Sequence, residues 1–306
     1  MVGIQTGGSK RPFFCVHPAG GTVHAFIPLS RRLGPDQPLY GLQAAGLEGE
    51  QEPYTRIEDM AARYVEAIRA MQPEGPYMLG GWSLGGAVAF EMAQQLHREG
   101  QEVALLAILD TAAPSPLDNF EPPEDGEVLA SVIGSKSLPM PYDDFRRLEL
   151  DEQIHIVLTW AKEVGVLPPD AGPPRVHRFL QVFKANVAAM ARYAPQVYQN
   201  RITLFRTHAP IEDEILPETA TDTQLSDPTR GWSALSSQPV EVYTVPGSHT
   251  QIVLEPHVRT LAEQLQNCLD AAQSTSNDSS STTAMVMQME HGLREDLHPL
   301  LESHPS

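Results

Sequence analysis

The sequence contains few of the residues that build disulfide frameworks or metal sites. Only two cysteines, Cys15 and Cys268, occur in the 306 residues, and they lie far apart in the chain. No Cys-x-x-Cys pair and no His-x-x-x-His pair offers the spacing of metal ligands. We therefore expect a chain without disulfides or a bound metal, from a reducing compartment, the cytoplasm.

Long apolar runs and basic charge are also scarce. The apolar run at 103–109 is far shorter than the roughly 18 residues that a membrane span requires. The chain has 21 Lys and Arg against 39 Asp and Glu, which gives a net charge of −18. Nucleic-acid phosphates require a basic surface, so this balance argues against nucleic acid as a partner. Solubility is the plainest consequence of the acidity.

Hydrophobic residues make up 41 % of the chain, enough for a sizeable core, and they follow two periods. Helical patterns occur at 57–72 and 84–100, and the apolar residues of the first step by three and four. Alternation of these helices with near-continuous apolar strands predicts an α/β fold with a mostly parallel central sheet flanked by helices. The predicted strands are 12–18, 38–44, 76–82 and 103–109.

Strand patterns stop between residues 114 and 195. Proline-rich joints in this segment connect amphipathic patterns, of which 151–165 and 174–193 are the clearest. We expect 114–195 to be a helical lid inserted into the α/β core, because short helices separated by prolines bury little core of their own. An independent second domain is the alternative. Sheet patterns resume at 201–206 and 240–247, and a last helix is expected over 251–269.

Both ends of the chain differ in composition from the middle. Residues 1–11 include a Gly-rich stretch and are interpreted as a linker from an upstream domain. Residues 12–270 carry the α/β pattern. The segment 271–306 begins with a Ser/Thr-rich stretch, which predicts a disordered C-terminal tail. A short helix at 285–303 is the alternative for part of that tail.

The pattern Gly-x-Ser-x-Gly lies where a predicted strand meets a predicted helix. Its residues are Gly81, Trp82, Ser83, Leu84 and Gly85. This is the setting of a nucleophile elbow, in which a strained backbone lifts the serine Oγ above the sheet. Side chains two residues before and after the serine would collide in so tight a turn, which explains Gly81 and Gly85. A purely structural Gly-rich turn is the alternative.

A nucleophilic serine requires a base, and eleven histidines are available. His249 follows the last predicted strand, at the sheet edge where catalytic groups gather in open α/β sheets. In α/β-hydrolases the chain order is Ser, acid, His, which fits His249 and disfavours His17. His208 follows the preceding strand and is the main rival. The other candidates lie in predicted lid helices, at a helix end or in the tail: His155, His177, His97, His291, His298 and His304.

The acid that orients the base has three candidates. Asp110 ends the strand at 103–109 and therefore lies at the same sheet edge as Ser83. Asp222 and Asp227 follow the strand at 201–206, a position that many α/β-hydrolases use. Spacing alone favours Asp110 only slightly, since an aspartate at that place can also cap a turn.

An oxyanion hole requires two backbone N–H donors. Leu84 directly follows the serine and opens a helix whose first N–H groups have no partner within the helix. The second donor is expected from the loop after the first strand, where Gly20 and Gly21 let the backbone approach a ligand closely. We favour Ala19 for this position.

Together these segments resemble the thioesterase domain that terminates nonribosomal peptide and hybrid polyketide synthetases, a type I thioesterase of the α/β-hydrolase superfamily. The likeness is carried by PFFCVHPAGG, PLYGLQAAGL, PYMLGGWSLGGAVAFEMAQQL, VALLAILDTAAP and VPGSHTQIV. It covers about residues 5–270 and is loose in the lid. The resemblance implies Ser83 as nucleophile, His249 as base and Asp110 as the acid, with oxyanion donors at Ala19 and Leu84.

The resemblance also implies a partner and a reaction. An upstream carrier domain would deliver a peptidyl or polyketidyl chain as a thioester on its phosphopantetheine arm. The chain would pass to Ser83 and leave by hydrolysis or macrocyclisation, and the domain itself would bind no cofactor. A free-standing editing thioesterase or an esterase of small acyl groups is the first alternative. A hydrolase-like binding module without turnover is the second.

Overall fold

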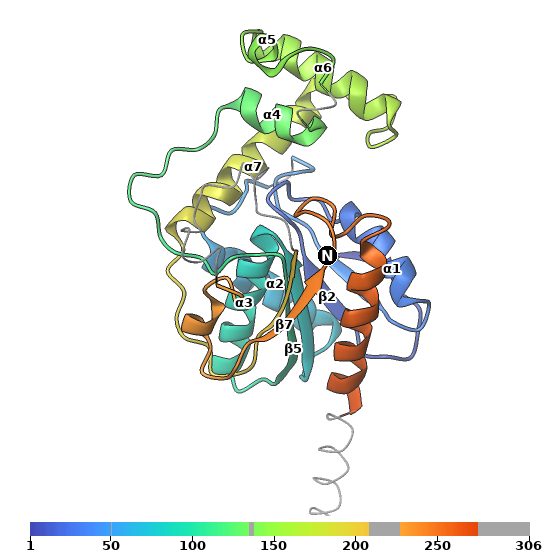
Figure 1. Cartoon of the computed structure of the whole chain (residues 1–306), viewed down its shortest axis with the longest axis vertical. Helices are drawn as coiled ribbons and strands as arrows, with labels where there is room; N and C mark the ends of the chain where they lie inside the picture. Colours follow the sequence, from blue (N-terminus) through green and yellow to red (C-terminus); the bar gives the residue numbers. More distant parts are fainter. Residues whose placement is uncertain (50, 135–137, 208–226, 275–306) are drawn as a thin grey trace, which may run out of the picture.

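The computed structural model describes residues 1–49, 51–134, 138–207 and 227–274, and within these ranges seven strands form one mostly parallel sheet (Figure 1). The strand order is β1-β3-β2-β4-β5-β6-β7. The edge pair β1–β3 is antiparallel, and the other neighbours are parallel. The strands are β1 (Val2–Gln5), β2 (Phe13–Val16), β3 (Leu39–Leu42), β4 (Tyr77–Trp82), β5 (Val103–Leu109), β6 (Thr203–Thr207) and β7 (Glu241–Val245).

The central strands are apolar on both faces, as a parallel sheet covered by helices requires. Every residue of β2 is buried, and β4 and β5 are buried over most of their length. The register places Val16 of β2 opposite Gly81 of β4, and Trp82 opposite Leu109 of β5. Leu109 in turn lies opposite Phe205 of β6. These pairings bring the residues that follow each strand to one edge of the sheet.

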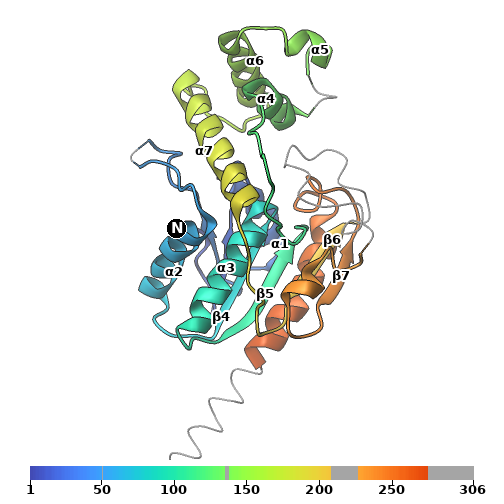
Figure 2. The same ribbon diagram turned by 90° about the vertical axis from the view of Figure 1, so that its left-hand side faces the viewer.

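Helices cover both faces of the sheet (Figure 2). α2 (Ile57–Met71) and α3 (Leu84–Arg98) contribute to one large cluster of buried apolar residues. α1 (Ile27–Leu33) and a last helix at 258–274 contribute to a second cluster. The apolar stripe predicted along 57–72 is the buried face of α2. Two short 3-10 helices are η1 (His24–Phe26) and η3 (Trp232–Leu235).

The segment expected to be helical is helical, and its described residues contain no strand. α7 rises from the core, and α4 to α6 lie around its upper part, away from the sheet (Figure 1). Buried residues of α4, α6 and α7 nevertheless belong to the same apolar cluster as those of α2 and α3, so the insertion shares that core. The lid role and its bounds at 114–195 stay a prediction. The helices are α4 (Asp125–Ile133), α5 (Tyr142–Phe145), α6 (Leu150–Glu163) and α7 (Pro173–Arg192).

The linker expected at residues 1–11 is wrong for its first half. Val2–Gln5 form β1, which pairs with β3 so that Val2 lies opposite Gly41. Short edge strands carry little apolar periodicity, because one side and one edge face solvent. This strand therefore left no signal in the pattern analysis.

The last helix begins later than the expected residue 251. Residues 251–257 form turns, and the helix starts at 258, two residues after Pro256. Proline lacks the backbone N–H and disfavours the helical conformation in the residue before it, which explains the delay. The described part of this helix extends to 274, past the predicted end at 269. The helix thus includes residues 271–274, which were predicted to belong to a disordered tail. The rest of that predicted tail, with the alternative helix at 285–303, lies outside the described residues.

Candidate active site

Ser83 occupies the turn between β4 and α3 in a backbone conformation that is rare for a residue with a side chain. Its φ is 58° and its ψ is −132°, and the residue is buried. Such a conformation costs on the order of 1–3 kcal/mol and persists only where the surroundings enforce it. The Ser83 N–H donates to the carbonyl of Leu109 at 3.1 Å, and the Ser83 carbonyl accepts from Gly86 N at 2.9 Å and from Thr111 Oγ1 at 2.7 Å. These bonds hold the turn predicted from the sequence.

The glycines around Ser83 are required by contact with backbone. A Cβ on Gly81 would lie 2.0 Å from the carbonyl oxygen of Gly85. A Cβ on Gly85 would lie 2.3 Å from the carbonyl oxygen of Val16 in β2. Backbone cannot move aside as a flexible side chain can, so both positions exclude a side chain. Gly86 was not singled out from the sequence, but it also has no room for a side chain. A Cβ added there would lie 2.3 Å from Thr111 Oγ1.

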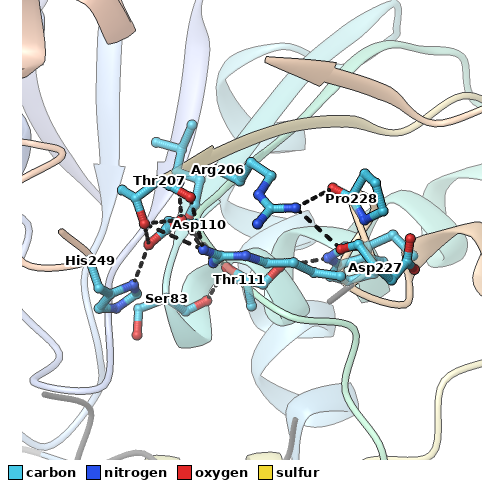
Figure 3. A network of polar contacts seen from close by, with 11 residues as sticks. Ser83, Asp110, Thr111, Arg206, Thr207, Asp227, Pro228 and His249 are labelled. Atoms are coloured by element: carbon cyan, nitrogen blue, oxygen red, sulfur yellow. Dashed lines mark hydrogen bonds and ion pairs between the residues drawn. The ribbon is translucent and has the colours of Figure 1, made fainter. Parts of the chain in front are cut away.

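Asp110 and His249 meet at the carboxyl edge of the sheet (Figure 3). Asp110 directly follows β5, and His249 lies in the loop after β7. His249 Nδ1 is 2.9 Å from Asp110 Oδ2, and both residues are buried. A carboxylate only accepts hydrogen bonds, so Nδ1 carries the proton in this contact and Nε2 is left as the basic nitrogen. This is the arrangement that a base and its orienting acid require.

The imidazole of His249 lies against the elbow. Its ring centroid is 5.5 Å from that of Trp82, the residue immediately before Ser83. Figure 3 shows the side chain of Ser83 directed toward the imidazole. The three residues predicted as nucleophile, base and acid are therefore brought together from three separate strand ends.

The second carboxylate oxygen of Asp110 is also fully engaged. Oδ1 accepts from Thr207 N at 2.6 Å and lies 3.1 Å from Thr207 Oγ1 (Figure 3). It also forms an ion pair with Arg230 Nη1 at 2.8 Å. Burial opposes ionisation, but the hydrogen bond with His249 and the charge of Arg230 outweigh it and hold the pKa of the Asp110 carboxyl below its usual range. Sequence reasoning missed Thr207 and Arg230, because neither belongs to a motif.

The two expected oxyanion donors lie on either side of the elbow. Leu84 is the first residue of α3, so its N–H has no partner within the helix. Ala19 is buried in the loop after β2, where Gly21 N donates to the Pro18 carbonyl at 2.8 Å. The carbonyl of Ala19 accepts from Asn186 Nδ2 of α7 at 2.8 Å, a contact that ties the inserted helix to this loop. The role of the two N–H groups stays a prediction.

The structure gives the rival residues other roles or does not describe them. Asp227 accepts from Thr229 N, Thr229 Oγ1 and Gly231 N at 2.6–2.9 Å, which makes it the cap of a turn. His17 lies 2.8 Å from the hydroxyl of Tyr64, and burial lowers its pKa to about 4. His97, His155 and His177 are exposed on their helices. Asp222, His208, His291, His298 and His304 lie outside the described residues.

Comparison with known proteins identifies the family. A family model described as "Thioesterase domain" matches residues 11–269. The chain belongs to the thioesterase domain family. It is 33 % identical over 207 residues to a "Dimodular nonribosomal peptide synthase" of Bacillus subtilis, a match that covers 68 % of this chain and 8 % of that protein. This thioesterase chain therefore spans less than a tenth of the length of that relative.

Solved thioesterase domains share the fold. The Vlm2 thioesterase domain is 26 % identical, with a TM-score of 0.63, over 87 % of this chain and 96 % of that one. The NocB thioesterase domain, in covalent complex with a fluorophosphonate nocardicin G analog, is 28 % identical, with a TM-score of 0.58, over 86 % and 95 %. The α/β-hydrolase fold expected from the sequence is confirmed by these likenesses, and the family makes the chain a hydrolase.

Two further observations concern the described part of the thioesterase. None of its helices is both long and apolar enough to cross a membrane. No group of three or more His, Cys, Asp or Glu side chains within those ranges is arranged to hold a metal ion.

The elbow contacts predict that Gly81→Ala is severely harmful. The new methyl group would meet the Gly85 carbonyl at 2.0 Å, so the turn must open or the variant must misfold. We expect a loss of about 1–3 kcal/mol in the free energy of unfolding, measured in urea, and loss of Ser83 labelling by a fluorophosphonate probe. Gly7→Ala is the matched control, because a Cβ there meets nothing within 4 Å. Equal stability of the two variants would contradict the packing argument.

The environment of Asp110 predicts an acid-sensitive contribution to stability. Its folded-state pKa lies below the usual 3.8, so the stabilisation is complete above about pH 5 and is lost as pH falls through the folded-state pKa. We expect the wild-type free energy of unfolding to fall more between about pH 5 and pH 2 than that of Asp110→Asn, which lacks this titration. Urea unfolding of both proteins at several pH values measures the difference. Parallel curves would show that Asp110 has the same pKa folded and unfolded.

Proposed function

We propose that this domain releases an acyl chain that a carrier domain delivers as a phosphopantetheine thioester. Ser83 is the nucleophile, His249 the base and Asp110 the acid that orients it. The backbone N–H groups of Ala19 and Leu84 bind the oxyanion. The phosphopantetheine arm belongs to the carrier domain and enters as part of the substrate, so the domain needs no resident cofactor of its own.

The first half of the reaction transfers the acyl chain to the serine. His249 Nε2 takes the proton from Ser83 Oγ as Oγ attacks the thioester carbonyl carbon. The carbon–oxygen bond forms, and the carbonyl electrons move onto an oxyanion that the two N–H groups stabilise. The intermediate then breaks the carbon–sulfur bond, and the thiol leaves with the proton held by His249. Asp110 stabilises the imidazolium in between.

The second half frees the chain from Ser83. Water, or a hydroxyl or amine of the chain itself, loses its proton to His249 Nε2 and attacks the ester carbonyl. The carbon–oxygen bond to Ser83 breaks, and Ser83 Oγ recovers the proton. Attack by water gives a free acid, and attack by the chain gives a macrocycle. Helices α4 to α7 influence the choice by admitting or excluding water and by folding the chain over the site.

One observation carries the proposal. His249 Nδ1 lies 2.9 Å from Asp110 Oδ2, and the imidazole lies against Trp82 beside the strained turn of Ser83, which supports His249 as an oriented base. The B. subtilis relative is named a nonribosomal peptide synthase, and the NocB thioesterase domain forms a covalent complex with a fluorophosphonate. These likenesses support a peptidyl chain as the substrate class and a serine as the group that accepts it.

Variants of the three residues are expected to separate catalysis from structure. Ser83→Ala should abolish labelling by a fluorophosphonate probe, and Asp110→Asn should lower kcat by roughly 10⁴-fold, because the amide favours the wrong imidazole tautomer. Asp227→Asn is the control for a neighbouring aspartate that caps a turn, and it should retain most of the turnover. Hydrolysis of a peptidyl thioester and mass spectrometry of the labelled protein provide the measurements. A dead Asp227→Asn with an active Asp110→Asn would show that the acid is assigned to the wrong residue.

A comparison of substrates tests the terminal role against an editing role. We expect the domain to turn over a long peptidyl thioester with a kcat/KM at least about tenfold above that of an acetyl thioester, since binding of remote groups is used to orient the reacting ester. Mass spectrometry of the released product distinguishes the free acid from a macrocycle. Turnover confined to the short thioester would favour a free-standing editing thioesterase. Labelling of Ser83 without turnover of either substrate would favour a binding module.

A further inference from the structure

The proposed mechanism does not use the buried guanidinium of Arg230 beside Asp110. Its residue is only 2 % exposed, and its Nη1 pairs with Asp110 Oδ1 at 2.8 Å. Its Nη2 lies 3.3 Å from Thr207 Oγ1, which itself lies 3.1 Å from both oxygens of Asp110. Arg230 thus contacts the carboxylate directly and also through the Thr207 hydroxyl.

The turn that carries Arg230 is fixed on both sides. Arg230 itself has a φ of 48°, and its N–H donates to the Asp227 carbonyl at 2.9 Å. Arg206 Nη1 reaches the same carbonyl at 3.2 Å, from β6. On the other side, Trp232 Nε1 donates to the Thr111 carbonyl at 2.7 Å, so the turn is tied to the loop after β5. The arginine is therefore held in place by its own backbone.

Arg230 and His249 compete for one carboxylate. Asp110 gives Oδ1 to Arg230 and Oδ2 to His249. A cation beside a carboxylate weakens the attraction of that carboxylate for a second cation. The imidazolium of His249 is then less stabilised than it would be beside an unpaired aspartate, and the neutral, basic imidazole is favoured.

We propose that Arg230 is a positioning residue for this site. Together with Thr207 it fixes the orientation of Asp110, and its charge lets His249 stay neutral at a lower pH than an unpaired Asp110 would allow. The inference rests on the proposed function, because His249 acts as a base only in that reaction. The charges that act on Asp110 are those of His249 and Arg230, and the neighbouring Arg206 is influenced by Arg230, Asp110 and Asp227.

The test is the pH dependence of kcat/KM for a short peptidyl N-acetylcysteamine thioester. Arg230→Met removes the charge, so we expect the acidic limb to move up by about one pH unit. On the alkaline plateau, where His249 is neutral in both proteins, we expect a loss of about tenfold from poorer orientation. Arg230→Lys keeps the charge but loses the second nitrogen, which contacts the Thr207 hydroxyl. We therefore expect its acidic limb to stay near that of the wild type and its plateau to fall.

Arg201→Met is the matched control, since it removes the same charge from an exposed residue just before β6. We expect its profile to coincide with that of the wild type. An unshifted limb in a folded Arg230→Met variant, or an equal shift in Arg201→Met, would overturn the inference. Folding is checked by circular dichroism and thermal melting.

Thr207→Val keeps the test decisive if Arg230→Met does not fold. The substitution preserves shape and the backbone N–H and removes only the hydroxyl that bridges Arg230 and Asp110, so we expect a lower plateau and a smaller upward shift of the limb. A wild-type profile in Thr207→Val would then overturn the inference. Failure of the proposed function looks different, because the wild-type protein would neither be labelled at Ser83 nor turn over the thioester.

Discussion

The turn between β4 and α3 leaves no room for a side chain two residues before or two residues after Ser83, and the rest of the site depends on that lack of space. Because Gly81 and Gly85 carry no Cβ, the first turn of α3 can press against the backbone of β4 and β2, and Gly86 lets it approach Thr111. The helix therefore begins directly after Ser83, at Leu84, whose N–H has no partner within the helix. The strain of a φ of 58° is offset by hydrogen bonds from neighbouring strand ends, which makes the turn a property of the whole sheet edge.

Parallel pairing makes residues far apart in the chain into neighbours at that edge. Ser83 follows β4, Asp110 follows β5, Thr207 ends β6 and His249 follows β7, and these strands are adjacent in the sheet. Asp110 also has a positive φ, of 52°, and its N–H donates to the Phe205 carbonyl at 2.7 Å. Two adjacent strands thus end in strained residues, and the strain turns both side chains toward one point. A sheet with a shifted register would separate them, so the proposed site requires the register as much as it requires the residues.

The residues that can be recognised from the sequence are those whose chemistry needs a local pattern. Ser83 is recognisable because its turn demands glycines at fixed spacing. His249 and Asp110 follow predicted strands, but spacing favoured Asp110 over its rivals only slightly, and the family resemblance decided between them. Arg230 and Thr207 carry no such mark, since their partner lies 120 and 97 positions away and any donor of suitable length could serve. The edge strand β1 was missed for a similar reason. It forms by hydrogen bonding to β3, and its sequence carries no apolar pattern. The apolar periodicity of the last helix favoured a start at 251, but Pro256 delays the start to 258.

The chain has a net charge of −18, yet the charge nearest to the buried Asp110 carboxylate, apart from His249, is the buried cation of Arg230. A buried Asp110 without Arg230 would favour the imidazolium more, which would narrow the pH range in which His249 can act as the proposed base. Pairing Asp110 with a cation brings the resting group of aspartate, arginine and neutral histidine to no net charge, which lowers the cost of burying it. The carboxylate still meets His249 Nδ1 through its second oxygen, so orientation is kept while attraction is moderated. The balance between these two effects is set by geometry, since the arginine and the histidine bind opposite oxygens of one carboxylate.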